Sequence, residues 1–253
     1  MRCFHPSPGP RARLVCLPHA GGSASFFLPF SKLLSPEYEV LSIQYPGRQD
    51  RRLEPLIDSV DRLSDLIADE LGPWLDLPMA FFGHSMGALV AYETARRLEA
   101  EGKRVEALFV SGRRAPSRHR DEVVHQYDDE RLLKEIRNLN GTDERVLNDP
   151  EILRPMLTVI RSDYKAVETY MHIQGIQLSS PIHAHIGLED ARVCIDEAKA
   201  WKEHTSGRFE LHTHRGGHFY LAEDDRKLIE NIVDVLSGET AQPQYFLPPA
   251  EGR

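Results

Sequence analysis

The chain has 253 residues, of which 41% are hydrophobic and 28% are charged, with a formal net charge of −8 at pH 7. This is the composition of an ordinary globular protein, and it excludes a fibrous or largely disordered chain. At this length one hydrophobic core is expected, so residues 1–253 are interpreted as a single domain. The negative charge disfavours nucleic acid and anionic membrane as partners, and we expect neither.

The cysteines and the N-terminal segment indicate the cellular compartment. Cys3, Cys16 and Cys194 are too few and too far apart for a disulfide framework or a zinc site. Their odd number suits a reducing compartment, and we expect all three to be buried thiols. Residues 1–13 lack the apolar run of a secretory signal, and no later run approaches the length of a membrane span. We therefore expect a cytoplasmic protein.

Short apolar runs rich in β-branched residues alternate with longer helical patterns from Arg13 to about Leu236. This rhythm predicts an α/β fold with a mostly parallel central sheet flanked by helices. Amphipathic spacing predicts helices over Ser59–Leu71 and Glu223–Leu236, whereas residues 238–253 have no periodicity and are expected to form a flexible tail. The expected strands are Arg13–Leu17, Glu39–Ile43, Met79–Phe82, Val105–Ser111, Pro181–Ile186 and Phe209–Thr213.

One gap between predicted strands is too long for a simple crossover, which needs only about a dozen residues. It covers residues 112–180, and an inserted subdomain at about 113–180 explains it. Within the insertion a helix is expected over Asp128–Leu139. Asp149-Pro150 should begin a second helix, which Pro155 is expected to kink or restart.

The strongest local signal is Gly83-His84-Ser85-Met86-Gly87, a GxSxG sequence between a predicted strand and a helical pattern. A GxSxG sequence also arises by chance, and it is this context that favours a function. A serine in a tight strand-to-helix turn projects its hydroxyl from the sheet edge, and the flanking glycines allow close approach to neighbouring strands. We therefore expect Ser85 to be the nucleophile of a serine hydrolase with the α/β-hydrolase fold. We assign no chemistry to His84.

Among the 12 histidines, His218 is the candidate general base. Chain order in this fold runs nucleophile, acid, histidine, which directs the search to the C-terminal third. His218 lies in a loop between the last predicted strand and the last predicted helix, where a mobile base is expected. His212 and His214 lie in or at the end of that strand. They are interpreted mainly as packed or solvated rings, with either as an alternative base.

The loop after Pro181–Ile186 offers two carboxylates, Glu189 and Asp190, as the third catalytic group. Asp190 is the better placed candidate, and Glu189 is the alternative. The preceding strand, where some enzymes of this fold carry the acid, is followed by no carboxylate. Asp190 could instead be the N-cap of a helix that begins near Arg192. As the acid, it would orient the imidazole of His218 and stabilise its cation.

Four motifs follow one another in an order that resembles a known enzyme family. They are Leu17-Pro18-His19-Ala20-Gly21-Gly22-Ser23, Tyr45-Pro46-Gly47-Arg48, Gly83-His84-Ser85-Met86-Gly87 and Gly216-Gly217-His218-Phe219. Over about residues 13–236 the chain resembles the type II thioesterases, which are editing enzymes of polyketide and nonribosomal peptide assembly lines. The GxSxG motif is generic, whereas the Pro-His-Ala-Gly-Gly stretch is more diagnostic.

The resemblance implies that the long insertion is a helical lid and that the backbone amides of Ala20 and Met86 form an oxyanion hole. Amides in a loop or at a helix start suit this role because they have no intrahelical partner. For His19 the resemblance implies a structural hydrogen bond. Where the family often has Asp-Pro in the acid loop, this chain has Asp190-Ala191, so the rigidity of that loop can differ.

The activity implied by the resemblance is hydrolysis of a thioester through an acyl-enzyme on Ser85, with no metal ion or other cofactor. The expected partner is an acyl or peptidyl carrier protein that bears an aberrant or stalled acyl group on phosphopantetheine. Two alternatives stay open. One is a general carboxylesterase or acyl-CoA hydrolase with the same triad, and the other is a noncatalytic binding member of the fold.

Two groups of side chains have both a functional and a structural interpretation. The arginines at the start of the insertion can meet an acidic carrier protein or form a solvated face, and they are Arg113, Arg114, Arg118 and Arg120. Four apolar residues can line an acyl pocket or pack in the core, and they are Phe26, Phe27, Met156 and Leu157.

Overall fold

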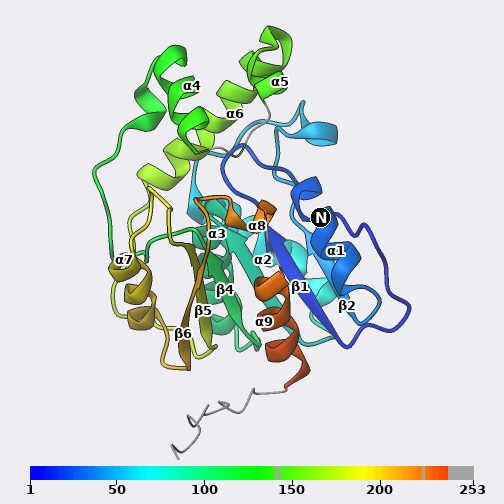
Figure 1. The fold of residues 1–253 in the computed structure, drawn as a ribbon. Helices are drawn as coiled ribbons and strands as arrows, with labels where there is room; N and C mark the ends of the chain where they lie inside the picture. Colours follow the sequence, from blue (N-terminus) through cyan, green and yellow to red (C-terminus); the bar gives the residue numbers. More distant parts are fainter. Residues whose placement is uncertain (140, 142–143, 224–225, 239–253) are drawn as a thin grey trace, which may run out of the picture.

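A sheet of six parallel strands forms the centre of the protein. The computed structural model describes residues 1–139, 141, 144–223 and 226–238. In these ranges the strands are β1 (Ala12–Leu17), β2 (Tyr38–Ser42), β3 (Met79–His84), β4 (Leu108–Ser111), β5 (Ile182–Gly187) and β6 (Phe209–His214). They pair in the order β2-β1-β3-β4-β5-β6 (Figure 1). The expected α/β fold is confirmed, although β4 starts later than predicted because its pairing with β5 begins only at Leu108.

Helices cover both faces of this sheet, so neighbouring residues of one strand are buried on opposite sides. Val15 lies in the core beneath α2 and α3, whereas Cys16 lies in the core beneath α1 and α9. The helices are α1 (Leu28–Leu34), α2 (Val60–Leu71), α3 (Met86–Ala100), α4 (Asp129–Asn138), α5 (Glu144–Leu147), α6 (Pro150–Glu168), α7 (Ile195–Lys199), α8 (Tyr220–Glu223) and α9 (Arg226–Ser237).

The predicted helix starts in the first half of the chain and in the insertion are confirmed by their caps. The Ser59 hydroxyl accepts a hydrogen bond from the Arg62 amide at the start of α2, and the Asp149 carboxylate accepts one from the Glu151 amide at the start of α6. The expectation that Pro155 restarts the second helix is wrong, because α6 is a single helix with Pro155 inside it. Pro155 is exposed, so water can satisfy the carbonyl that its missing amide leaves free.

The insertion between β4 and β5 contains α4, α5 and α6, which lie above the carboxyl ends of the strands (Figure 1). These helices and the turn before them share a small apolar cluster, formed by Val124, Leu132, Ile136, Leu147, Leu157 and Ile160. The end of α6 instead packs on the main core through Ala166 and Val167. The second half of α6 therefore joins the insertion to the body of the protein.

Some expectations fail or fall outside the described residues. The three cysteines are free thiols, but only Cys16 is buried; Cys3 is half-buried, and Cys194 is exposed because it precedes a surface helix. Of the predicted tail, 238–253, all but Gly238 lies outside the described residues. In the part of the chain that is described, no helix combines the length and the apolar character needed to span a membrane.

A buried ion pair ties α6 to the loop that follows β2. Asp163 is fully buried, and both of its carboxylate oxygens contact the Arg48 guanidinium. Asp163 also accepts a hydrogen bond from the Gly21 amide, 2.7 Å away, in the loop after β1. Burial raises the pKa of Asp163, while Arg48 and the Gly21 amide act in the opposite direction. One carboxylate of the insertion thus holds two loops at the sheet edge.

The first turn of α3 lies directly against the end of β1. A β-carbon at Gly87 would lie 2.0 Å from the Leu17 carbonyl oxygen, and a β-carbon at Gly83 would lie 2.2 Å from the Gly87 carbonyl oxygen. Both separations are far shorter than van der Waals contact, so both positions require glycine. This approach places Ser85, between the two glycines, next to the loop that follows β1.

Replacement of Gly87 by alanine should lower the free energy of unfolding by more than about 3 kcal/mol, because the added methyl group must displace the backbone of β1. Gly72→Ala is the matched control, since a β-carbon there meets nothing within 4 Å. It should change the free energy of unfolding by less than about 1 kcal/mol. Urea unfolding followed by circular dichroism measures both, and equal stability of the two variants would contradict this packing.

Arg48→Ala leaves the Asp163 carboxylate buried without its partner and should lower the free energy of unfolding by about 3–5 kcal/mol at pH 7. In this variant burial raises the pKa of Asp163 further, so the loss should shrink as the pH falls toward the carboxyl's ordinary range. Lys165→Ala breaks an exposed ion pair between α6 and Asp58 and should cost less than about 1 kcal/mol. Equal losses in the two variants would show that the buried pair is not an anchor.

Candidate active site

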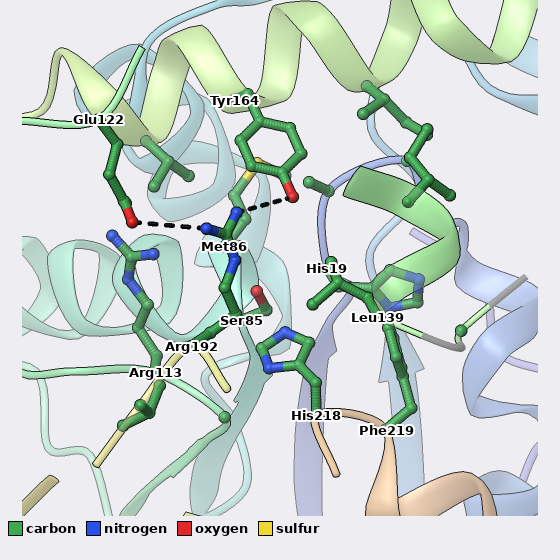
Figure 2. A pocket seen from close by; sticks show the side chains of 18 of the residues that line it. His19, Ser85, Met86, Arg113, Glu122, Leu139, Tyr164, Arg192, His218 and Phe219 are labelled. Atoms are coloured by element: carbon green, nitrogen blue, oxygen red, sulfur yellow. Dashed lines mark hydrogen bonds and ion pairs between the residues drawn. The ribbon is translucent and has the colours of Figure 1, made fainter. Parts of the chain in front are cut away.

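Ser85 lies at the turn between β3 and α3, at the carboxyl edge of the sheet. Its backbone has a φ of 55° and a ψ of −115°, a strained conformation for a residue with a β-carbon. The Ser85 amide donates to the Ser111 carbonyl oxygen of β4 at 2.8 Å, which holds the turn against the neighbouring strand. The predicted strand-to-helix turn is confirmed, and Ser85 lines a pocket above the sheet edge (Figure 2).

His218 and Asp190 form a hydrogen-bonded pair beside this turn. Nδ1 of His218 lies 2.9 Å from Oδ2 of Asp190, and the two side chains are 5% and 0% exposed. Because an ionised carboxylate only accepts hydrogen bonds, Nδ1 carries the proton and Nε2 keeps a free lone pair. Figure 2 shows the His218 ring beside Ser85 in the same pocket. The arrangement can transfer a proton from a hydroxyl at this point to Nε2.

Backbone hydrogen bonds join the loops that carry Asp190 and His218. The Leu188 amide donates to the His214 carbonyl at 2.8 Å, and the Glu189 amide donates to the Gly216 carbonyl at 2.9 Å. The pairing of β5 with β6 therefore continues into both loops. The Glu189 residue is exposed, whereas the neighbouring Asp190 side chain is the one that reaches His218.

The second oxygen of Asp190 has a local partner. Oδ1 accepts a hydrogen bond from the Arg192 amide at 2.8 Å, which fixes the rotation of the carboxylate. The alternative that Asp190 is the N-cap of a helix near Arg192 is wrong, because Cys194 is the N-cap of the helix that follows, α7. The Asp190 side chain thus makes two hydrogen bonds, one to the backbone of its own loop and one to the His218 imidazole.

His84 and the two alternative bases do not line the pocket, although the His84 ring lies behind that of His218, 5.0 Å between centroids. Burial lowers the pKa of His84 well below its usual value, and its Nδ1 lies 2.9 Å from the Ser111 hydroxyl. His214 is buried with its ring stacked on Tyr220, 4.4 Å between centroids. His212 packs against His185 at 4.6 Å. None of these three rings is among the described residues that line the pocket.

His19 does line the pocket, next to Phe219. Its ring meets Phe26 and Phe219 edge-on at centroid distances of 4.7 and 4.8 Å, and burial lowers its pKa to about 3. Its Nδ1 has no hydrogen-bond partner among the described residues. The expected structural hydrogen bond is therefore not made at Nδ1, and aromatic packing holds the ring.

Ala20 and Met86 both line this pocket. Ala20 follows β1, and Met86 is the first residue of α3, where an amide has no intrahelical acceptor. The neighbouring Gly21 amide is taken by Asp163. No acceptor among the described residues takes the amides of Ala20 and Met86. Both amides are therefore available as hydrogen-bond donors.

The pocket lies between the sheet edge and the insertion, with about 900 Å³ of empty space including its opening to solvent. The insertion contributes an apolar wall that includes Ile136, Leu139, Met156, Ile160 and Val167. Of the four apolar residues singled out in the sequence, Met156 is the one that lines this wall. Phe27 and Leu157 are buried in apolar cores, and Phe26 packs against the core of Phe27. The site can accommodate an apolar chain beside Ser85.

The arginine-rich start of the insertion is not a free basic patch. Three of the arginines form ion pairs: Arg114 with Glu122, Arg118 with Glu203, and Arg120 with Glu197. Arg113 instead turns its side chain into the pocket (Figure 2). Burial, and then the neighbouring Arg114, lower the pKa of Arg113 to about 9. Arg113 is therefore part of the pocket and not of an exposed face.

Sequence reasoning missed Asp163 and Arg192. The signal for Asp163 was present, because it is a charged residue on the apolar side of a helix, between Ile160 and Ala166. Arg192 has no such local signal. It pairs with Glu135 at 3.1 Å and donates to the Tyr164 hydroxyl at 3.1 Å, both on the distant insertion.

Comparison of the sequence with known proteins identifies close relatives. Residues 12–237 match the family model described as the thioesterase domain. Thioesterase PikA5 of Streptomyces venezuelae is 52% identical over 238 residues, which cover 93% of this chain and 85% of that protein. The gramicidin S biosynthesis protein GrsT of Aneurinibacillus migulanus is 37% identical over 228 residues, covering 89% of each.

Solved structures with a similar fold are also thioesterases. The type II thioesterase BorB from the borrelidin biosynthetic cluster has a TM-score of 0.88 and 47% identity, covering 93% of this chain and 96% of BorB. The thioesterase RedJ from the prodiginine pathway of Streptomyces coelicolor has a TM-score of 0.85 and 34% identity, covering 93% and 90%. The chain therefore belongs to the thioesterase family of thioester hydrolases, where it groups with the type II thioesterases of polyketide and nonribosomal peptide pathways.

Proposed function

We propose that the protein is an editing thioesterase that removes aberrant or stalled acyl groups from the phosphopantetheine arm of a carrier protein. The observation that carries this proposal is the 2.9 Å contact between His218 and Asp190 beside the strained turn at Ser85. We assign Ser85 as nucleophile, His218 as general base and Asp190 as the group that orients it. The amides of Ala20 and Met86 are assigned as the oxyanion hole.

In the first half-reaction, Ser85 Oγ attacks the thioester carbonyl carbon while His218 Nε2 takes the hydroxyl proton. The carbonyl oxygen becomes negatively charged and accepts hydrogen bonds from the Ala20 and Met86 amides. Asp190, hydrogen-bonded to Nδ1, stabilises the imidazolium. When the tetrahedral intermediate collapses, the carbon–sulfur bond breaks, and the phosphopantetheine thiol leaves with the proton from His218. The product is an acyl ester on Ser85.

In the second half-reaction, water replaces the thiol. His218 Nε2 removes a proton from the water as its oxygen attacks the ester carbonyl of the acyl-enzyme. The second tetrahedral intermediate uses the same two amides. Its collapse returns the proton from His218 to Ser85 Oγ and releases the acid. The same imidazole therefore acts as base and acid twice in one cycle.

The insertion, at about 113–180, is proposed to act as a lid on this site. It supplies the apolar wall of the pocket, and its helices lie over the sheet edge. A carrier-bound acyl group is delivered on a long flexible arm, so the lid must admit the arm and shield the acyl chain from water. The proposed location is the cytoplasm, since the free thiols Cys3, Cys16 and Cys194 suit a reducing compartment.

The decisive assay follows release of acetyl or another short acyl group from a phosphopantetheinylated carrier domain and, in parallel, from free CoA. Wild type should prefer the carrier-bound group, and Ser85→Ala should lower the rate by at least about 10⁴ because no acyl-enzyme can form. Equal or faster hydrolysis of acyl-CoA or oxygen esters would identify a general hydrolase. Absence of Ser85-dependent turnover on every substrate would indicate a noncatalytic protein.

Asp190→Asn keeps the size of the side chain but removes the charge that orients His218, and it should lower kcat by about 10⁴. Glu189→Gln is the matched control, because Glu189 is the adjacent carboxylate and is exposed. Its kcat should stay within about threefold of wild type, as is usual for surface substitutions. Steady-state kinetics on the same acyl substrate measure both, and a larger loss in Glu189→Gln would transfer the acid role to Glu189.

A further inference from the structure

Three side chains that the proposed hydrolysis does not use meet on the edge of the sheet. The register of β5 and β6 places His183 beside Glu210 and His185 beside His212. Because side chains alternate along a strand, His183, Glu210 and His212 project from the same face. His183, Glu210 and His212 bring their donor atoms within 4.8 Å of one another. None of the three lines the Ser85 pocket as the described residues define it.

The spacing of these donor atoms suits one metal ion. Glu210 Oε2 lies 3.6 Å from His183 Nδ1 and 3.3 Å from His212 Nε2. In a tetrahedral zinc site, bonds of about 2.0–2.1 Å put neighbouring ligand atoms roughly 3.3–3.5 Å apart. Both distances to the carboxylate therefore need only small adjustments. The other oxygen, Oε1, is held by Arg208 at 2.5 Å, which keeps Oε2 turned toward the two rings.

Burial leaves the ring nitrogens without other partners. His183 is 4% exposed, and His183 Nδ1 and His212 Nε2 are buried without a well-aligned hydrogen-bond partner among the described residues. Unsatisfied buried nitrogens are costly, and a bound cation would satisfy both. Metal ions bind the neutral form of imidazole through the lone pair of such a ring nitrogen.

We propose that His183, Glu210 and His212 bind a divalent first-row transition metal ion, with Zn²⁺ as its representative. Two imidazoles and one carboxylate are a ligand set that such ions use. The side chains of Glu210 and His212 are 26% and 28% exposed, so water can reach the ion and complete its coordination. The ion would bridge β5 to β6 at a position outside the catalytic pocket.

Because the proposed site joins β5 to β6, the ion would have a structural role. β5 leads directly into the loop of Asp190, and β6 leads into the loop of His218. Between the metal ligands and these loops, His185 Nδ1 and His214 Nε2 lie 3.1 Å apart across the same two strands. A metal bridge at His183 and His212 would therefore fix the spacing of the two strands that carry the acid and the base.

The test uses the full chain without an affinity tag, treated with a chelator and then titrated with Zn²⁺ by calorimetry. Wild type should bind one equivalent with a dissociation constant in the micromolar range or tighter, and its Tm should rise with Zn²⁺. His212→Ala and Glu210→Gln should each weaken this binding at least tenfold. His119→Ala is the matched control, since His119 is a half-exposed histidine beside a carboxylate, Asp121, elsewhere on the chain, and it should bind as wild type does.

Co²⁺ gives a second readout that does not depend on stability. Bound by two imidazoles and a carboxylate, Co²⁺ should show visible absorption bands that His212→Ala removes while its circular dichroism spectrum stays native. Absence of stoichiometric binding would overturn the proposal. Binding that survives in both His212→Ala and Glu210→Gln would also overturn it, because the ion would then sit elsewhere, such as at the exposed thiol of Cys194. If His212→Ala does not fold, the loss of metal binding is measured in Glu210→Gln, a conservative change on the edge strand β6.

Discussion

The active-site edge depends on how closely the backbone of β1 approaches the first turn of α3. Gly87 has no side chain to separate these two segments, and Gly83 of β3 has none to separate β3 from the same turn. Ser85 is therefore held between the two glycines in a strained turn. Packing of a helix against two strands offsets this strain. The loop of Ala20 and the first residue of α3, Met86, line the same pocket. One close approach therefore positions Ser85, the proposed nucleophile, beside the segments that carry Ala20 and Met86, the proposed oxyanion donors.

Asp190 and His218, the proposed acid and base, are positioned by a different contact, the pairing of β5 with β6. Hydrogen bonds between the strands continue past Gly187 and His214, so the two loops leave the sheet already joined. The Asp190 carboxylate therefore lies within hydrogen-bonding distance of the His218 ring. Among the described residues β6 is the last strand of the sheet and pairs only with β5. The proposed metal ion would act between these two strands, at the edge of the sheet.

The parts of the site that follow from local sequence were predictable, and the parts made by distant packing were not. Ser85 and His218 could be selected as candidates because each stands at a characteristic place between a strand and a helix, and the structure brings both to one pocket. Asp190 required elimination of other carboxylates as well. The pair of Arg48 and Asp163 joins residues 115 positions apart, and only tertiary packing decides that these charges are buried. Likewise, Arg113 resembles its neighbouring arginines in sequence, yet those three form ion pairs with carboxylates whereas Arg113 turns into the pocket.

The attachment of α6 divides the insertion into two parts with different freedom to vary. Asp163, Lys165 and Glu168 bind the second half of the helix to loops of the body and to the turn before α4. The first half contributes Met156 to the pocket wall but makes no comparable attachment among the described residues. Substitutions there can reshape the space for the acyl chain without moving Ser85. A protein built in this way can acquire a new substrate preference in evolution while its chemistry stays the same.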